Sequence, residues 1–186
     1  MELLVLGALR YLGRGNTFDC LEENTFVSRE VHRKFFHQFI EWGSTHLFQQ
    51  FIVAPTATDD PTESSKEFEI AGMHGCIGST NGCHVGMLNC LHQLLQFNMG
   101  CKLNMPTRTY DLTCNHRRRI FNNTSGHPGR WCDKTLVRFD KFVMNVKHGM
   151  ILPDHTFTLL SKGADGSILK KQFSGVWLMA DNGHLG

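Results

Sequence analysis

The sequence lacks a hydrophobic run long enough to cross a membrane, and it lacks an export signal. Its most apolar N-terminal stretch, residues 3–6, is far shorter than the roughly 20 residues that a spanning helix needs, and Arg10 follows soon after. No basic segment precedes this stretch, as a signal peptide would require. We therefore expect a protein without a membrane-spanning segment, located inside the cell.

Paired cysteines and a strong net charge are also missing. The seven cysteines form an odd set without a C-x-x-C pair, which is typical of a reduced chain rather than a disulfide scaffold. The formal net charge is only +2, so any argument for nucleic-acid binding must come from local clusters. With 41% hydrophobic and 19% charged residues, the chain is expected to fold rather than remain disordered.

Residues 1–53 predict a helical region. Leucines at positions 3, 6, 9 and 12 recur at helical spacing, a second short helix follows Thr17, and a third begins after Ser28 and ends before Gly43. Three short helices with a basic third one are typical of a DNA-binding helix-turn-helix. An ordinary helical bundle with exposed cations is the alternative. The candidate DNA-binding residues of the third helix are Arg29, Arg33 and Lys34.

Residues 54–73 are polar, contain prolines and show no hydrophobic periodicity, and we interpret them as a surface linker. Residues 74–186 predict an α/β domain with a loop and partial helix at 88–102 and a helix at 134–146. A buried strand is expected at each end of this domain, and two hairpins between them. The tip of the first hairpin carries Arg117, Arg118 and Arg119.

Polar side chains follow the two apolar strands. Asn81 comes at the end of the first apolar run, and Asp181 comes directly after the last one, residues 176–180. Because ligands of open α/β sheets gather at the carboxyl ends of strands, we expect Asn81 and Asp181 to face each other from adjacent central strands. Asp133 stands at the start of the predicted helix, where an acid suits the N-terminal cap.

Three short motifs occur in order along this part of the chain: Asn81-Gly82-Cys83-His84, Pro128-Gly129-Arg130-Trp131-Cys132-Asp133 and Asp181-Asn182-Gly183-His184. They resemble the D-G-T-H motif, the Pro-Gly…His-Asp segment and the D-x-G-Y motif of the nuclease domain of PIF/Harbinger transposases and their domesticated relatives. The resemblance covers most of the chain, including its helical N-terminal part.

This resemblance implies an RNase H-like mixed sheet with flanking helices, in which three acids bind two Mg²⁺ or Mn²⁺ ions for cleavage of DNA phosphodiester bonds. It also implies a nuclear location and an accessory DNA-binding protein as partner. Two departures predict impaired catalysis. Asn81 replaces the first acid, and the third acid would lie on a helix beyond Gly186. By position Asp181 matches the second acid, and Asp133 is either an auxiliary metal ligand or a cap.

Other interpretations of the same residues remain open. A non-catalytic remnant could bind protein, or bind DNA by gripping phosphates with the arginines at positions 117–119. Zinc is a further candidate, although the spacing matches no common zinc motif; its ligands would be His74, Cys76, Cys83 and His84. A nucleophilic pair of Cys83 with His84 is disfavoured, because adjacent strand residues point to opposite faces.

Overall fold

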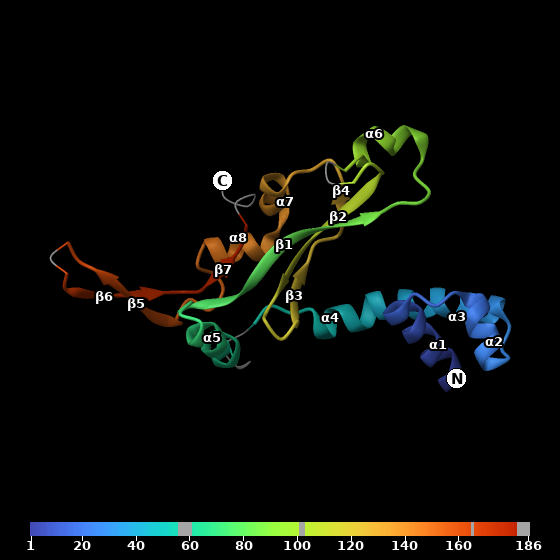
Figure 1. The fold of residues 1–186 in the computed structure, drawn as a ribbon, viewed down its shortest axis with the longest axis horizontal. Helices are drawn as coiled ribbons and strands as arrows, with labels where there is room; N and C mark the ends of the chain where they lie inside the picture. Colours follow the sequence, from blue (N-terminus) through green and yellow to red (C-terminus); the bar gives the residue numbers. More distant parts are fainter. Residues whose placement is uncertain (56–60, 101–102, 165, 182–186) are drawn as a thin grey trace. The chain divides into compact units, whose positions relative to one another are not determined.

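The structure is a computed structural model that describes residues 1–55, 61–100, 103–164 and 166–181 (Figure 1). The chain divides into two compact units, Met1–Ile52 and Val53–Gly186. This division lies one residue from the end of the expected helical region. No helix in the described ranges is both long enough and apolar enough to cross a membrane.

The first unit is helical, as its leucine spacing predicts. The Thr17 side chain accepts a hydrogen bond from the Cys20 backbone N–H at 3.3 Å and so caps the second helix, as expected. Gly15, with φ of 67°, ends the first helix in a left-handed conformation. The helices are α1 (Glu2–Arg14), α2 (Phe18–Thr25), α3 (Arg29–Trp42) and, after a π-helical turn at Gly43–Leu47, α4 (Phe48–Phe51).

The three longer helices of this unit pack around aromatic rings. The Tyr11 ring lies 4.5 Å, centroid to centroid, from both Phe18 and Phe36. His32 is buried against Gly7, where even a Cβ atom would come within 2.8 Å of the imidazole. The His32 Nε2 atom lies 2.8 Å from the Thr25 hydroxyl. This contact joins α2 to α3.

The second unit contains a mixed sheet with the strand order β3-β2-β1-β7, and β4 pairs with β2. β2 is antiparallel to β1 and to β3, whereas β7 runs parallel to β1. The expected α/β class with a mixed sheet is therefore confirmed. The strands are β1 (Cys76–Gly86), β2 (Thr107–Cys114), β3 (Ile120–Asn123), β4 (His127–Pro128) and β7 (Trp177–Met179).

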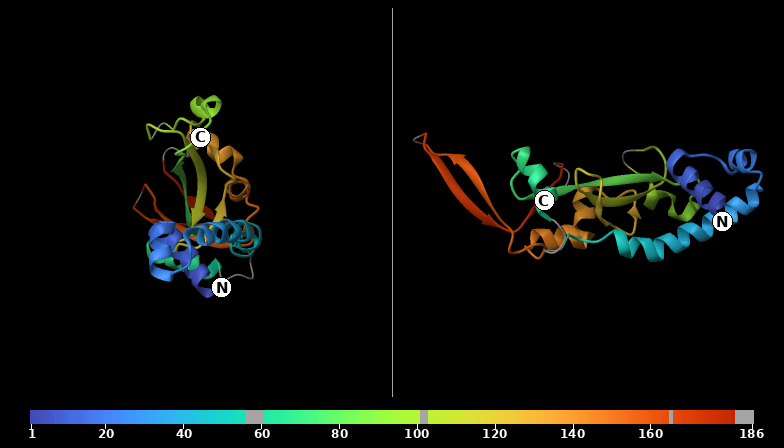
Figure 2. Two further views of the ribbon diagram at one scale, coloured as in Figure 1. Left: turned by 90° about the vertical axis from the view of Figure 1, so that its right-hand side faces the viewer. Right: turned by 90° about the horizontal axis from the view of Figure 1, so that it is seen from below.

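Helices flank this sheet on the way from β4 to β7 (Figure 2). The single helix predicted at 134–146 is two helices, α7 (Asp133–Phe139) and α8 (Lys141–Lys147). The break falls at Asp140, whose carboxylate accepts hydrogen bonds from the backbone N–H groups of Phe142 and Val143 and so starts a new helix. The core of this unit consists of Ile77, Phe121, Phe142 and Val146. Between β1 and β2 the chain forms a 3₁₀ turn (His92–Leu94) and α6 (Leu95–Asn98).

The segment predicted as a linker contains a helix, α5 (Pro61–Ile70). Proline is tolerated at the first helical position, because the missing N–H would have no partner there. Ser65 and Phe68 are buried, and the Asn115 amide donates a hydrogen bond to the Ser64 hydroxyl at 2.9 Å. Tertiary contacts of a few residues thus stabilise a helix that has no apolar stripe of its own.

The second predicted hairpin is confirmed as a two-stranded antiparallel ribbon of β5 (Thr156–Lys162) and β6 (Ile168–Ser174). The ribbon extends away from the mixed sheet in Figure 1 and in the right-hand view of Figure 2. Its base is fixed at three points. The Phe157 ring packs on Gly75, the Gly175 N–H donates to the His155 carbonyl at 2.7 Å, and the Trp177 N–H donates to the Gly75 carbonyl at 3.1 Å.

We predict that Gly75→Ala destabilises the second unit by roughly 2–5 kcal/mol. About 1–2 kcal/mol comes from placing a Cβ at a φ of 80°. A further ~1–3 kcal/mol comes from the clash with the Phe157 ring. Urea unfolding followed by Trp177 fluorescence measures this loss, because the Trp177 indole N–H donates to the neighbouring His74 carbonyl at 2.8 Å.

Gly72→Ala is the matched control. Gly72 has the same φ of 80°, but a Cβ there would meet no atom within 4 Å. This variant should lose only the backbone component, about 1–2 kcal/mol. Equal losses for the two variants would contradict the packing of Phe157 on Gly75.

Candidate functional site

Asn81 lies within a strand rather than at its end, which corrects the expectation from the glycine-rich sequence. β1 continues to Gly86, because its residues from Ser79 onward pair with β2 without interruption. Ser79 is paired with Met179 across the parallel β1–β7 ladder. Asn81 lies two residues further along β1, whereas Asp181 lies two residues beyond the end of β7 at Met179, outside the paired register. Both are exposed.

Asp133 lies against the opposite face of β1. A Cβ built on Gly82 would come within 3.0 Å of the Asp133 Oδ1 atom and 3.4 Å of Leu136. Because strand side chains alternate, the face that Gly82 presents to α7 is opposite to the face of Asn81. Asp133 is also not the cap of its helix. Cys132 occupies the N-cap, and Asp133 is the first residue of α7, where its charge still favours the helix dipole.

The candidate acid positions Asn81, Asp133 and Asp181 do not fit a site for two metal ions. Hard divalent cations require several charged oxygens, but residue 81 is an amide and Asp133 lies on the other face of β1. The described part of the chain holds no group of three or more His, Cys, Asp or Glu residues that could bind a metal ion.

Two of the four residues proposed as zinc ligands, Cys76 and His84, are engaged in other contacts. Burial raises the pKa of the Cys76 thiol, which donates to the Gly78 carbonyl. The His84 Nδ1 atom lies 3.1 Å from the hydroxyls of Thr107 and Thr109. Cys83, one residue earlier on the strand, is exposed on the opposite face. Cys83 and His84 therefore do not form a nucleophilic pair.

A buried polar layer, which we did not predict, lies between β2 and the α7–α8 helices. The inward face of β2 consists of Thr107, Thr109, Asp111 and Thr113, all with 0% exposure. The Thr80 hydroxyl donates to the Asp111 carboxylate at 3.0 Å, and the Thr124 hydroxyl accepts from the Asp111 N–H at 2.8 Å. The period-two pattern of residues 107–113 predicts a strand, but it does not show that the threonine and aspartate face is the buried one.

Asp140 is the second carboxylate of this layer. It is fully buried, and it lines a cavity of about 210 Å³ with Asn122, Thr124 and His127. Burial and then the nearby charge of Asp111 raise the pKa of Asp140, although its hydrogen bonds with Val143, Phe142 and Asn122 oppose this rise. Burial likewise lowers the pKa of His127. Both Asp140 oxygens accept hydrogen bonds, so its role is to begin α8 and join it to β3.

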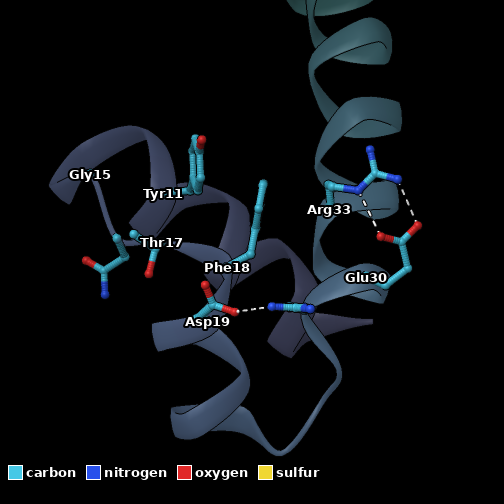
Figure 3. A pocket seen from close by; sticks show the side chains of 9 residues that line it. Tyr11, Gly15, Thr17, Phe18, Asp19, Glu30 and Arg33 are labelled. Carbon is cyan, nitrogen blue, oxygen red and sulfur yellow. Dashed lines mark hydrogen bonds and ion pairs between the residues drawn. The ribbon is translucent and has the colours of Figure 1, made fainter.

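The predicted DNA-binding cations of α3 all pair with carboxylates of the same unit. Arg29 contacts Asp19 at 3.1 Å, while Arg33 and Lys34 contact Glu30 at 2.8 Å and 3.7 Å. Figure 3 shows the Arg33–Glu30 pair beside Tyr11 and Phe18, around a cavity of about 380 Å³. Hydrogen bonding from Arg33 lowers the pKa of Glu30 to about 2. With five Lys and Arg against six Asp and Glu, residues 1–52 have a formal charge of −1.

The three arginines at the tip of the β2–β3 hairpin are in different environments. The Arg117 guanidinium donates two hydrogen bonds to Glu67 of α5, and His116 contacts the same carboxylate. Arg118 has a φ of 64° in the turn, and the Arg119 guanidinium lies 6.0 Å from the centre of the Phe121 ring. Arg117 therefore fastens the hairpin to α5, and the tip presents less free charge than its sequence indicates.

No match was found when the chain was compared with protein-family models, with curated proteins and with solved structures.

We predict that Asp140→Ala destabilises the second unit by roughly 1–3 kcal/mol, because α8 loses its cap and the Asn122 amide loses its acceptor. Asp140→Asn keeps the capping oxygen and should cost less. Unfolding in urea, followed by Trp131 and Trp177 in a Trp42→Phe background, separates this unit from the first. An Ala variant as stable as the wild type would contradict the capping role.

The same variants predict a pH dependence. The folded-state pKa of Asp140 lies above its ordinary value of 3.8, so the folded state binds this proton more tightly than the unfolded chain. Its contribution to stability is present below pH 3.8 and is lost as the pH rises through the folded-state pKa. Asp140→Asn has no such loss, so its stability relative to the wild type should rise as the pH increases above 3.8 and through the folded-state pKa.

Proposed function

We propose that this chain derives from a metal-dependent DNA nuclease of the Harbinger transposase type, with an RNase H-like core, and that its cleavage activity is impaired. The observation that carries the proposal is the parallel pairing of β7 with β1. This pairing makes neighbours of the strand that contains Asn81 and the strand that precedes Asp181, the two residues that match acid positions of that family by motif.

The connectivity of the sheet also supports this origin. Three consecutive antiparallel strands precede a helical crossover, and the next strand of the sheet returns parallel to β1, at its free edge. This order is compatible with the RNase H-like core that the motifs imply. The coarse α/β class alone would be compatible with many functions, because one fold hosts unrelated activities.

The impairment follows from the chemistry at residue 81. Cleavage by two Mg²⁺ or Mn²⁺ ions requires ligands that are anionic, because the cations must be held close together against their mutual repulsion. Asn81 offers only a neutral carbonyl oxygen. Asp181 would remain a ligand for one ion, and the position of Asp133 on the other face of β1 favours a structural role for that residue.

A chain that has lost cleavage can retain binding to duplex DNA, which is the second candidate function. The second unit favours it, since residues 53–186 hold 14 Lys and Arg against 11 Asp and Glu, a formal charge of +3. The first unit, at −1, does not. An accessory DNA-binding protein and a nuclear location would accompany either function.

We predict that Asn81→Asp tightens Mn²⁺ binding about tenfold or more, because under this proposal it adds a second carboxylate to the site that contains Asp181. Titration calorimetry with Mn²⁺ measures the affinity, and a supercoiled-plasmid nicking assay with Mn²⁺ measures cleavage. The wild type should show no nicking above the level without protein.

Asn81→Asp combined with Asp181→Ala is the control, and its Mn²⁺ affinity should fall back to that of the wild type. Two results would oppose the proposal. Nicking by the wild type that disappears in Asp181→Ala would contradict the impairment, and an unchanged Mn²⁺ affinity in Asn81→Asp would contradict a shared site of residues 81 and 181.

A further inference from the structure

Only the base of the β5–β6 ribbon contributes to the packing of its unit. Apart from Phe157, Gly163 and Phe173, every described residue from Thr156 to Ser174 is exposed. The Phe157 and Phe173 rings stack at 5.6 Å, centroid to centroid, where the ribbon leaves the sheet. A two-stranded ribbon is only marginally stable by itself. Because the part beyond this anchor adds nothing to the core, we considered whether it binds a ligand.

The two faces of the ribbon differ. The strand register places Thr158 opposite Gln172, Leu160 opposite Lys170, and Lys162 opposite Ile168. Because opposed residues share a face, these six side chains form one surface, the Lys162–Lys170 face. On the other face the Lys171 amine lies over the Phe173 ring, 5.1 Å from its centre. The Lys162–Lys170 face thus combines two cations, two polar groups and two aliphatic side chains.

The lysines of the ribbon favour binding to an anionic partner. Its described residues include three lysines and no carboxylate, and Asp165 of the turn lies outside the described residues. Pairing of two ribbons edge to edge would bring like charges together, and edge lysines are a common device against such pairing. A polyanion would be attracted for the same reason.

We propose that the Lys162–Lys170 face of the β5–β6 ribbon binds in the major groove of duplex DNA. That groove is about 12 Å wide and admits a two-stranded ribbon. Lys162 and Lys170 contact phosphates or guanine edges, Thr158 and Gln172 contact base edges, and Leu160 and Ile168, which are 63% and 71% exposed, pack on thymine methyl groups. This inference does not depend on descent from a nuclease.

The test is the salt dependence of binding to a fluorescent 25-base-pair duplex, measured by anisotropy in EDTA. Lys162→Gln with Lys170→Gln should weaken binding roughly tenfold or more, and should reduce the slope of log K against log salt by about two. Lys171→Gln, on the other face, should have less effect. Far-UV circular dichroism checks that the variants remain folded.

Lys134→Gln with Lys141→Gln is the matched control, because it removes two exposed cations from α7 and α8 of the same unit. This variant should keep the wild-type salt slope. An equal loss in the control, or no duplex binding by the wild type, would overturn the proposal. So would equal affinity for duplex RNA, whose major groove is too narrow for a ribbon.

Two further outcomes separate the alternatives. If the Lys162 and Lys170 substitutions abolish self-association in sedimentation experiments while duplex binding is unchanged, the face binds a second copy and the proposal fails. The binding assay contains EDTA and uses no variant at residue 81 or 181, so a negative result there does not test the nuclease origin. The Mn²⁺ experiments test that origin, and a negative result in them does not bear on DNA binding by the ribbon.

Discussion

The parallel pairing of β7 with β1 is the constraint on which the second unit depends. β7 has three residues, so its position relies on further bonds at its start, where the Trp177 backbone and indole N–H groups donate to the carbonyls of Gly75 and His74. This pairing closes the crossover that carries α7 and α8 over the sheet. The same bonds hold the base of the ribbon, since β6 leads directly into β7.

Much of the local structure follows from the sequence, because local chemistry determines it. Thr17 caps its helix, glycine ends α1 in a left-handed conformation, and both hairpins form around the polar turns that separate their strands. The parallel pairing of β7 with β1 agrees with the expected adjacency of the two apolar strands, because apolar strands joined by a helical crossover tend to be parallel neighbours. The caps and the turns are decided by a few residues within their own segment, whereas the β1–β7 pairing joins segments about 100 residues apart.

The buried polar layer could not be inferred in this way. Along β2, Tyr110 and Leu112 alternate with threonines and Asp111, and hydrophobicity alone favours burying the aromatic and aliphatic side chains. The structure buries the other set, because the crossover places α7 and α8 over it and supplies Thr124, Asn122 and the capped Asp140 as hydrogen-bonding partners. Which face is covered is a long-range property. The same holds for α5, which is stabilised by β1 and by Asn115 rather than by its own pattern.

The two proposals, for an ancestral cleavage site and for DNA binding, concern separate parts of the second unit. Asn81 lies in β1 and Asp181 follows β7 of the mixed sheet, whereas Lys162, Lys170 and Lys171 lie along the β5–β6 ribbon. Substitution of an acid at residue 81 changes the charge available for a metal ion but leaves the ribbon and its anchor at Gly75 untouched. Metal binding at residue 81 can therefore be lost while the ribbon keeps its structure, because the two regions share only the bonds that fix β7. A chain of this design can lose catalysis by a single substitution and remain a folded, cationic binding protein.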